Sequence, residues 1–478
     1  MKVKQIGIIL GPFLFFLLLF LPVPPGLEPN AWKAIAMAAW MLTWFITEAL
    51  PLPVTALLPM VIQPLLGLAK VKDAMAPYSD PIIYLFMGGF TIALAMERWN
   101  LHRRIALNIL RMTGSNANGI ILGFFLATAL ISMWISNTAT TIMMLPMALS
   151  VIELVNQKDE KGNPLPGMRN FAISMMLGVS YASSIGGVGT LIGTPPNVVF
   201  AAQMKELFDK QIPFGQWMAV GVPYAILLLL GGYWIIVRWI YPNGLGKIEG
   251  AKERLDAELA KLGPMSAGEK RTTLVFILAA AGWIFKLPIE KAFPGLVIEE
   301  SVVGICAALM LFAVPISWKN YTFALDWKHT EKLPWGILLL FGGGLSLAAA
   351  LSSTGLIGLI GQQFAGGNGG SWLFLFALVT VTVFLTELLS NVALVVVFIP
   401  VIGAVAQAMN IDPVVMCIPV TLAASSGFML PMSTPPNAIV FSSGHLTVTT
   451  MMRAGVWLNL LSIVLMTIFG KLVVPLFF

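Results

Sequence analysis

The sequence predicts an all-α polytopic membrane protein with about 11 transmembrane helices, two re-entrant hairpins and an inverted internal repeat. Hydrophobic residues make up 58% of the 478 residues and charged residues only 10%, against roughly 25% charged residues in soluble domains. Apolar stretches recur that approach the roughly 20 residues needed to cross a bilayer as a helix. One pair of uncharged motifs occurs twice, which indicates an internal duplication.

Hydropathy and the positions of proline and glycine predict the membrane spans in chain order. The first span, 5–22, follows two lysines as a signal sequence would, but it lacks a small-residue cleavage pattern and is expected to be retained. The others are expected at 31–49, 51–68, 82–100, 171–204, 216–240, 272–287, 298–317, 334–352, 413–444 and 454–475. The charged segment 241–271 is expected to be a linker with one amphipathic helix.

The distribution of basic residues predicts the orientation. If the apolar stretches 118–154 and 371–408 each return to their own side, most of the 28 Lys and Arg residues fall on the side of the N-terminus. The positive-inside rule then places the N-terminus in the cytoplasm and the C-terminus outside, in the plasma (inner) membrane with lipid around the helices. The net charge of +6 is explained by topology, and no nucleic-acid partner is expected.

The repeat is defined by a constant offset. Ser136-Asn137-Thr138 and Ser390-Asn391-Val392 are 254 residues apart, and the same offset superposes Gly88-Gly89 on Gly342-Gly343. The predicted topology counts an odd number of crossings between equivalent points, so the second copy would be inverted, as in many secondary transporters. For the glycine pairs, close helix packing is the favoured interpretation.

Two hairpins are predicted to turn inside the membrane. The second arm of the first hairpin, 139–152, has only about 14 residues before Glu153, too few for a crossing. Its tip would be Ser136-Asn137-Thr138, and the hairpin 371–408 would repeat the design from the opposite side.

Two later spans are predicted to be broken helices. Pro195-Pro196 and Pro435-Pro436 lack amide hydrogens and disfavour helix in the preceding residue. Thr194 and Thr434 are candidate N-caps of the second halves. Helix N-termini gathered near the midplane favour an anion, and Ser, Thr, Asn and carbonyl oxygens suit sodium better than zinc or copper.

Glu387 allows two interpretations. An intramembrane carboxylate three residues before Ser390 could be a proton or cation site. Because its counterpart in the first copy is Met133, a structural hydrogen-bonding role is equally favoured. No catalytic constellation is found in the spans, so an enzyme is not expected.

At these motifs the chain resembles the divalent-anion:sodium symporter (DASS) family, the INDY-type dicarboxylate transporters. The resemblance includes Thr47-Glu48-Ala49-Leu50-Pro51 and departs from the family at Val392, where a threonine is frequent. It implies a first sodium site at Ser132, Ser136, Asn137 and Gly193, and a second at Thr386, Leu389, Asn391 and Ser433. It implies substrate contacts at Asn137, Thr138, Thr194, Ser390, Asn391, Thr434 and Pro435.

The resemblance also implies a homodimer that works as an elevator. A scaffold of 1–112 and 272–367 would hold a mobile transport domain of 113–240 and 368–478, joined by the linker 241–271. The expected function is sodium-coupled symport of C4 dicarboxylates such as succinate, malate or fumarate, with Na⁺ as the co-transported ion. The alternative is a sodium-independent di- or tricarboxylate exchanger, and an anion channel is less favoured.

Overall fold

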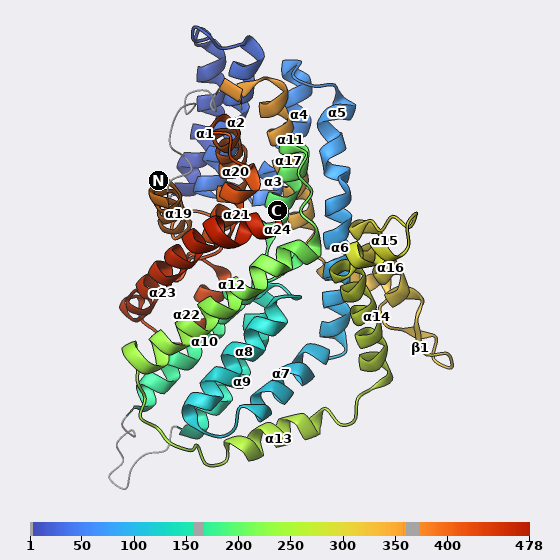
Figure 1. Cartoon of the computed structure of the whole chain (residues 1–478), viewed down its shortest axis with the longest axis vertical. Coiled ribbons are helices and arrows are strands. Elements are labelled where there is room, and N and C mark those ends of the chain that lie inside the picture. Colours follow the sequence, from blue (N-terminus) through green and yellow to red (C-terminus); the bar gives the residue numbers. More distant parts are fainter. Residues whose placement is uncertain (1–2, 156–166, 357, 360–371) are drawn as a thin grey trace.

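The computed structural model describes residues 3–155, 167–356, 358–359 and 372–478, and nearly all of their regular structure is helical (Figure 1). The predicted all-α class is confirmed. Among the described residues, seven helices are long and apolar enough to cross a membrane, or eight if the bent pair α14 and α15 is one span. Shorter apolar helices lie in three further expected spans, 51–68, 298–317 and 413–444, while two of the seven long helices, Asn137–Val155 and Asn391–Ala408, are hairpin arms. The total of about 11 crossings therefore stays a prediction.

The N-terminal part begins with the first four expected spans. Its elements are α1 (Val3–Phe20), α2 (Pro29–Thr47), α3 (Leu52–Thr55), α4 (Leu58–Leu66), α5 (Val71–Met75), the 3-10 turn η1 (Ala76–Ser79), α6 (Pro81–Arg98) and α7 (Leu101–Met112). The amphipathic helix α7 was not expected. It packs on α8 and α13 and therefore connects the first four spans to the first hairpin and to the linker.

The next part contains the first hairpin and the first broken helix. Its elements are α8 (Ala117–Ser132), α9 (Asn137–Val155), α10 (Met168–Gly187), η2 (Leu191–Gly193), α11 (Pro195–Phe208), α12 (Phe214–Trp234) and the π-helical η3 (Ile235–Ile240). The expectation of a short second arm was wrong, because α9 begins at Asn137 and continues through Glu153 to 19 residues. Length alone therefore does not make this hairpin re-entrant.

The linker and the spans after it form a compact group. Their elements are α13 (Ala251–Lys261), α14 (Ala267–Ile284), α15 (Lys286–Ala292), α16 (Glu300–Ala313), β1 (Pro315–Ser317), β2 (Thr322–Phe323), η4 (Trp327–Lys332) and α17 (Trp335–Ser353). The antiparallel pair of β1 and β2 was not expected. Figure 1 shows α6, α14 and α16 side by side, and these three helices contact one another.

The C-terminal part holds the second hairpin and the second broken helix. Its elements are α19 (Trp372–Thr386), α20 (Asn391–Ala408), α21 (Pro413–Ala424), α22 (Pro435–Phe441), α23 (Val448–Ile468), the π-helical η5 (Phe469–Val473) and α24 (Val474–Phe477). The expected start of the hairpin at 371 and the domain boundary at 367/368 lie outside the described residues. Helices α20, α21 and α19 pack together much as α8, α9 and α10 do, and α11 packs on both α20 and α17.

The repeated glycine pairs lie at close helix contacts, as expected. A Cβ on Gly88 would overlap the backbone of Gly304 in α16, and one on Gly343 would overlap the carbonyl of Ala56. Small residues at these positions allow the helix backbones to approach closely.

The linker helix α13 is held against α7 by ion pairs. Arg103 lies 2.7 Å from Glu258, and Arg111 lies 3.1 Å from Asp256. The hydrogen bond from Lys261 and the nearby arginines hold the pKa of Glu258 below its usual range. Both partners of the Arg103–Glu258 pair are therefore charged at neutral pH, which fixes the linker on this face.

Candidate functional site

The two hairpin tips have the same local geometry. In the first, the hydroxyl of Ser132 donates to Oδ1 of Asn137 at 2.8 Å. In the second, the hydroxyl of Thr386 donates to Oδ1 of Asn391, also at 2.8 Å. The residues of the second pair lie 254 positions after those of the first. The two copies of the sequence motif therefore share the hydrogen bond that orients the side-chain amide at each tip.

Both predicted helix breaks are present. The break between α10 and α11 covers 188–194, and the break between α21 and α22 covers 425–434. Thr194 and Thr434 occupy the N-cap positions in extended conformations, with φ of −146° and −142°. Their placement as N-caps is confirmed, but only the hydroxyl of Thr434 accepts the capping bond, from the amide of Asn437.

Two buried asparagines that sequence reasoning left without a role hold the breaks together. Nδ2 of Asn197 donates to the carbonyl oxygens of Gly187 at 3.3 Å and Thr190 at 2.8 Å. Nδ2 of Asn437 donates to those of Gly427 at 3.1 Å and Leu430 at 2.9 Å. Each asparagine lies in the helix that follows its break and binds carbonyls of the chain that precedes this helix. The available signal was their place directly after each Pro-Pro pair.

The tips and breaks surround one cavity of about 880 Å³. All the predicted substrate residues line it, namely Asn137, Thr138, Thr194, Ser390, Asn391, Thr434 and Pro435. Of the predicted sodium ligands, Ser136, Leu389 and Ser433 line it as well. The structure thus brings together in one place residues that are up to about 300 positions apart in the chain.

The remaining sodium candidates lie just behind the cavity wall. Ser132 and Thr386 are buried and are bonded to the tip asparagines. Gly193 is in contact with Gly187, and a Cβ at Gly193 would overlap the carbonyl oxygen of Gly187. A residue with a side chain at 193 would therefore push the two ends of the first break apart.

Charged residues line the cavity away from the motifs. Glu48, Glu97 and Lys332 are part of its wall. The sequence motifs did not indicate that any of these three residues would line the site. The charge pattern assigns Arg98 and Lys332 to the cytoplasmic side, so this wall faces the cytoplasm in the predicted topology.

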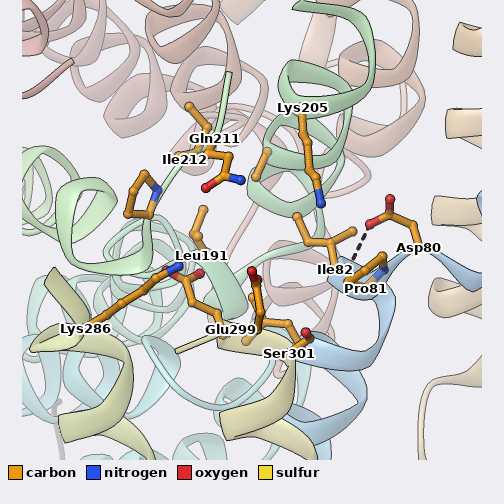
Figure 2. A pocket seen from close by; sticks show the side chains of 14 residues that line it. Asp80, Pro81, Ile82, Leu191, Lys205, Gln211, Ile212, Lys286, Glu299 and Ser301 are labelled. Atoms are coloured by element: carbon orange, nitrogen blue, oxygen red, sulfur yellow. Dashed lines mark hydrogen bonds between the residues drawn. The ribbon is translucent and has the colours of Figure 1, made fainter. Parts of the chain in front are cut away.

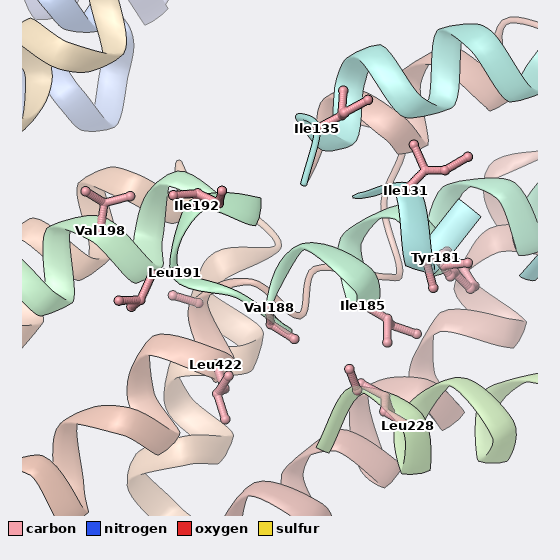
Figure 3. Close-up of a cluster of buried hydrophobic side chains, with 14 of the residues drawn as sticks. Ile131, Ile135, Tyr181, Ile185, Val188, Leu191, Ile192, Val198, Leu228 and Leu422 are labelled. Atoms are coloured by element: carbon pink, nitrogen blue, oxygen red, sulfur yellow. The ribbon is translucent and has the colours of Figure 1, made fainter. Parts of the chain in front are cut away.

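The first break is enclosed in apolar side chains. Figure 3 shows Val188, Leu191 and Ile192 on the chain between α10 and α11, with Leu422 of α21 close by. All four are buried. The backbone amides and carbonyls of this break are therefore shielded from water, where they interact more strongly with charge than in bulk solvent.

Glu387 has a structural hydrogen-bonding role in the structure. Its carboxylate is buried, with 4% of the residue exposed. It accepts from the backbone amides of Phe428 at 2.9 Å, Met429 at 2.9 Å and Leu430 at 3.1 Å, and from Nδ2 of Asn459 at 2.8 Å. These bonds tie the second hairpin to the second break and to α23.

A smaller cavity of about 80 Å³ lies elsewhere, between α6 and α16 on one side and α11 on the other. Figure 2 shows Lys205 and Asp80 at this cavity, with Lys286 and Glu299 across from them. The carboxylate of Glu300 at its wall accepts from the amide of Phe214 at 2.8 Å. None of the predicted site residues line it, so it is separate from the cavity at the motifs.

Comparison with known proteins decides the family. The sequence profile described as the sodium:sulfate symporter transmembrane region matches residues 2–478. The chain belongs to this family, the DASS transporters. It is therefore a membrane transporter and not an enzyme, and the resemblance found at the motifs is confirmed.

Several relatives in this family match over the whole chain. The sodium-dependent dicarboxylate transporter SdcS of Staphylococcus saprophyticus is 37% identical over 476 residues, covering 99% of this chain and 92% of the relative. The protein of the same name from Staphylococcus aureus is 36% identical, with coverage of 99% and 91%. The solved structure of the Alcanivorax borkumensis YdaH transporter has a TM-score of 0.52 at 15% identity, covering 86% of this chain and 87% of that one, and supports the fold.

Proposed function

We propose that this protein is a sodium-coupled symporter of C4 dicarboxylates such as succinate, malate and fumarate. The observation that carries the proposal is the convergence of both Ser-Asn tips and both Thr-Pro-Pro breaks on one cavity. The similarity to sodium-dependent dicarboxylate transporters supports the substrate class and the coupling ion.

The donors around the cavity suit a carboxylate at each end of a small solute. Helices α9, α11 and α20 begin at Asn137, Pro195 and Asn391, all of which line the cavity. Their N-termini carry partial positive charge, each worth about 0.3 to 1 kcal/mol and up to about 2 kcal/mol when partly buried. The hydroxyl and amide groups of Thr138 and Ser390 can donate hydrogen bonds to carboxylate oxygens.

Helix termini of this strength do not offset the desolvation of a dianion, which costs several kcal/mol per charge. Co-bound sodium supplies the missing positive charge in this proposal. The first ion would be held by Ser132, Ser136, Asn137 and Gly193, and the second by Thr386, Leu389, Asn391 and Ser433. Uncharged oxygen ligands of this kind match the preference of a hard cation.

The transport cycle is proposed to be an elevator movement of 113–240 and 368–478 against a scaffold of 1–112 and 272–367, in a homodimer. Support comes from the close packing of the two hairpins with the two breaks, which makes the site part of one unit. Glu48, Glu97 and Lys332 in the cavity wall support an inward-facing state, because the charge pattern assigns this wall to the cytoplasm.

The test is uptake of labelled succinate into proteoliposomes that contain the purified protein. We expect uptake that depends on external sodium, is lost in choline, and is inhibited by malate and fumarate. Uptake that persists in choline and requires dicarboxylate inside the vesicles would establish exchange instead. Citrate, sulfate and 2-oxoglutarate as competitors define the substrate range.

A further inference from the structure

We infer that Glu387 is a positioning residue for the second sodium site, where its carboxylate replaces a missing turn of helix and sets the affinity for sodium. The inference rests on the proposed sodium coupling and deepens it, since it explains how one of the two sites is built. It is carried by the four hydrogen bonds to the carboxylate and by a difference between the two breaks.

Relative to the asparagine that follows each Pro-Pro pair, the second break begins earlier in the chain than the first. Asn197 and Asn437 are equivalent at an offset of 240 residues, which also pairs Gly187 with Gly427. Helix α10 continues to Gly187, whereas α21 ends at Ala424, before the equivalent position. The chain beyond Ala424 is therefore unwound where the first copy is still helical.

An unwound segment leaves backbone amides without helical partners, and buried amides need an acceptor. In the first copy, the amide of Gly189 donates to the carbonyl of Gly186 at 2.9 Å, so the backbone satisfies itself. In the second copy, the amides of Phe428, Met429 and Leu430 donate to Glu387. Met133, the equivalent of Glu387, could not accept such bonds, which accounts for the acidic residue in one copy only.

The segment that Glu387 fixes adjoins the predicted second sodium site. The hydroxyl of Ser433 donates to the carbonyl of Gly427 at 3.1 Å and to that of Leu430 at 2.8 Å. A Cβ on Gly427 would lie 3.2 Å from Oγ of Ser433 and 3.5 Å from the carbonyl oxygen of Thr386. The backbone that carries the amides bound by Glu387 thus touches two of the predicted ligands.

Unwinding also leaves a carbonyl oxygen beside this site without a backbone amide donor. The carbonyl of Ala424, the last residue of α21, accepts from the hydroxyl of Thr386 at 2.6 Å. In a continuous helix this carbonyl would accept a backbone amide four residues later. The Glu387 carboxylate stabilises the unwound form and adds negative charge beside it, and both effects favour a bound cation.

The experiment measures the sodium dependence of Glu387→Gln. The amide keeps the volume but removes the charge and places N–H donors against the backbone amide of Leu430. We expect the sodium concentration for half-maximal succinate uptake to rise about fivefold or more, which corresponds to about 1 kcal/mol or more for a disrupted buried hydrogen bond. Asn459→Leu removes one donor to the carboxylate and should give a smaller rise in the same direction.

A second measurement does not depend on transport. The sodium-induced rise in the melting temperature of the purified protein, relative to choline, should require a higher sodium concentration in both variants. Glu300→Gln is the matched control, because Glu300 also accepts a backbone amide but lies at the separate cavity. Its sodium dependence should equal that of the unmodified protein.

The outcomes separate the inference from the proposed function. Absence of any sodium effect on the unmodified protein would overturn the proposed coupling. If the unmodified protein responds to sodium but Glu387→Gln and Asn459→Leu respond at the same concentrations, the inference is wrong. If Glu387→Gln does not fold, the sodium response of Asn459→Leu decides the inference. A variant that is less stable in choline but responds to the same sodium concentrations as the unmodified protein would also refute it.

Discussion

The two copies of the repeat share their binding geometry and differ in what supports it. Each tip amide is oriented by a hydroxyl at 2.8 Å, from Ser132 in one copy and Thr386 in the other. Each break is bridged by an asparagine amide, Asn197 or Asn437. The features that would contact a ligand are thus retained in duplicate.

The support around them is not duplicated. A carboxylate, Glu387, holds the second break, whereas apolar side chains surround the first. Asn437 also accepts from the hydroxyl of Ser180, while Oδ1 of the buried Asn197 has no hydrogen-bond partner among the described residues. The hydrogen bonds that orient the tips are thus the same in both copies, whereas the freed backbone groups of the breaks are satisfied by different partners.

The largest expected effect is a loss of transport, which should be equal for variants of the two hairpin tips. Asn137→Ala and Asn391→Ala should each reduce succinate uptake in proteoliposomes to background, because each removes a tip amide that faces the cavity. The folded state should persist as a single peak in size-exclusion chromatography. Asn108→Ala, on the exposed face of α7, is the control and should transport normally. Near-normal uptake by either tip variant would contradict the assigned site.

A second pair of variants tests whether the two breaks differ in how much their asparagines contribute to stability. Asn197→Leu and Asn437→Leu leave buried carbonyl oxygens unpaired, at a cost of about 1 to 3 kcal/mol for each lost partner. Asn437 also bonds Ser433 and Ser180, so its substitution should lower the melting temperature more. Equal losses, or the reverse order, would show that the additional bonds of the second copy contribute nothing to stability.

The glycine pairs test whether equivalent helix contacts in the two copies are equally crowded. Gly88→Ala and Gly342→Ala should each destabilise the protein by about 1 to 3 kcal/mol, the usual range for overpacking, because a Cβ would overlap the backbone of Gly304 in the first case and Tyr78 in the second. Gly246, whose Cβ would meet no neighbour within 4 Å, is the control. A normal melting temperature for Gly88→Ala would mean that α6 and α16 can separate without cost.

The smallest expected effect concerns the one tip position at which the copies differ. Thr138→Val should raise the KM for succinate by about 2- to 13-fold, since a hydrogen bond contributes about 0.5 to 1.5 kcal/mol. Val392→Thr should change the KM for succinate less, because the natural substrate is bound without that hydroxyl. A larger effect of Val392→Thr than of Thr138→Val would assign the substrate to the second tip.

Much of the arrangement of the candidate site could be predicted from the sequence because the motifs are local. Proline pairs break a helix wherever they occur within one, and Thr194 and Thr434 precede them, so the breaks and their N-cap positions followed directly. Close packing at Gly88 followed from the absence of a side chain. The predicted substrate residues gathered at one cavity because each lies at a tip or a break.

Other features depended on how far each helix runs. The sequence indicated that the second arm of the first hairpin is too short to cross the membrane. In the structure this arm, α9, extends past Glu153, because a charged side chain near a helix end can reach water without ending the helix. The amphipathic α7 and the strand pair β1 and β2 were missed, since short elements outside the apolar spans carry little periodic signal.

The sequence by itself determined the membrane class, the repeat and the residues at which backbone groups would be freed, because these follow from composition and from the chemistry of proline, glycine and asparagine. Only the tertiary structure decided which partners satisfy those freed groups. Glu387 illustrates the difference. The residue type alone shows that its carboxylate oxygens can accept hydrogen bonds. The groups that donate to them lie about 40 and 70 residues further along the chain, and only folding brings them within hydrogen-bond distance.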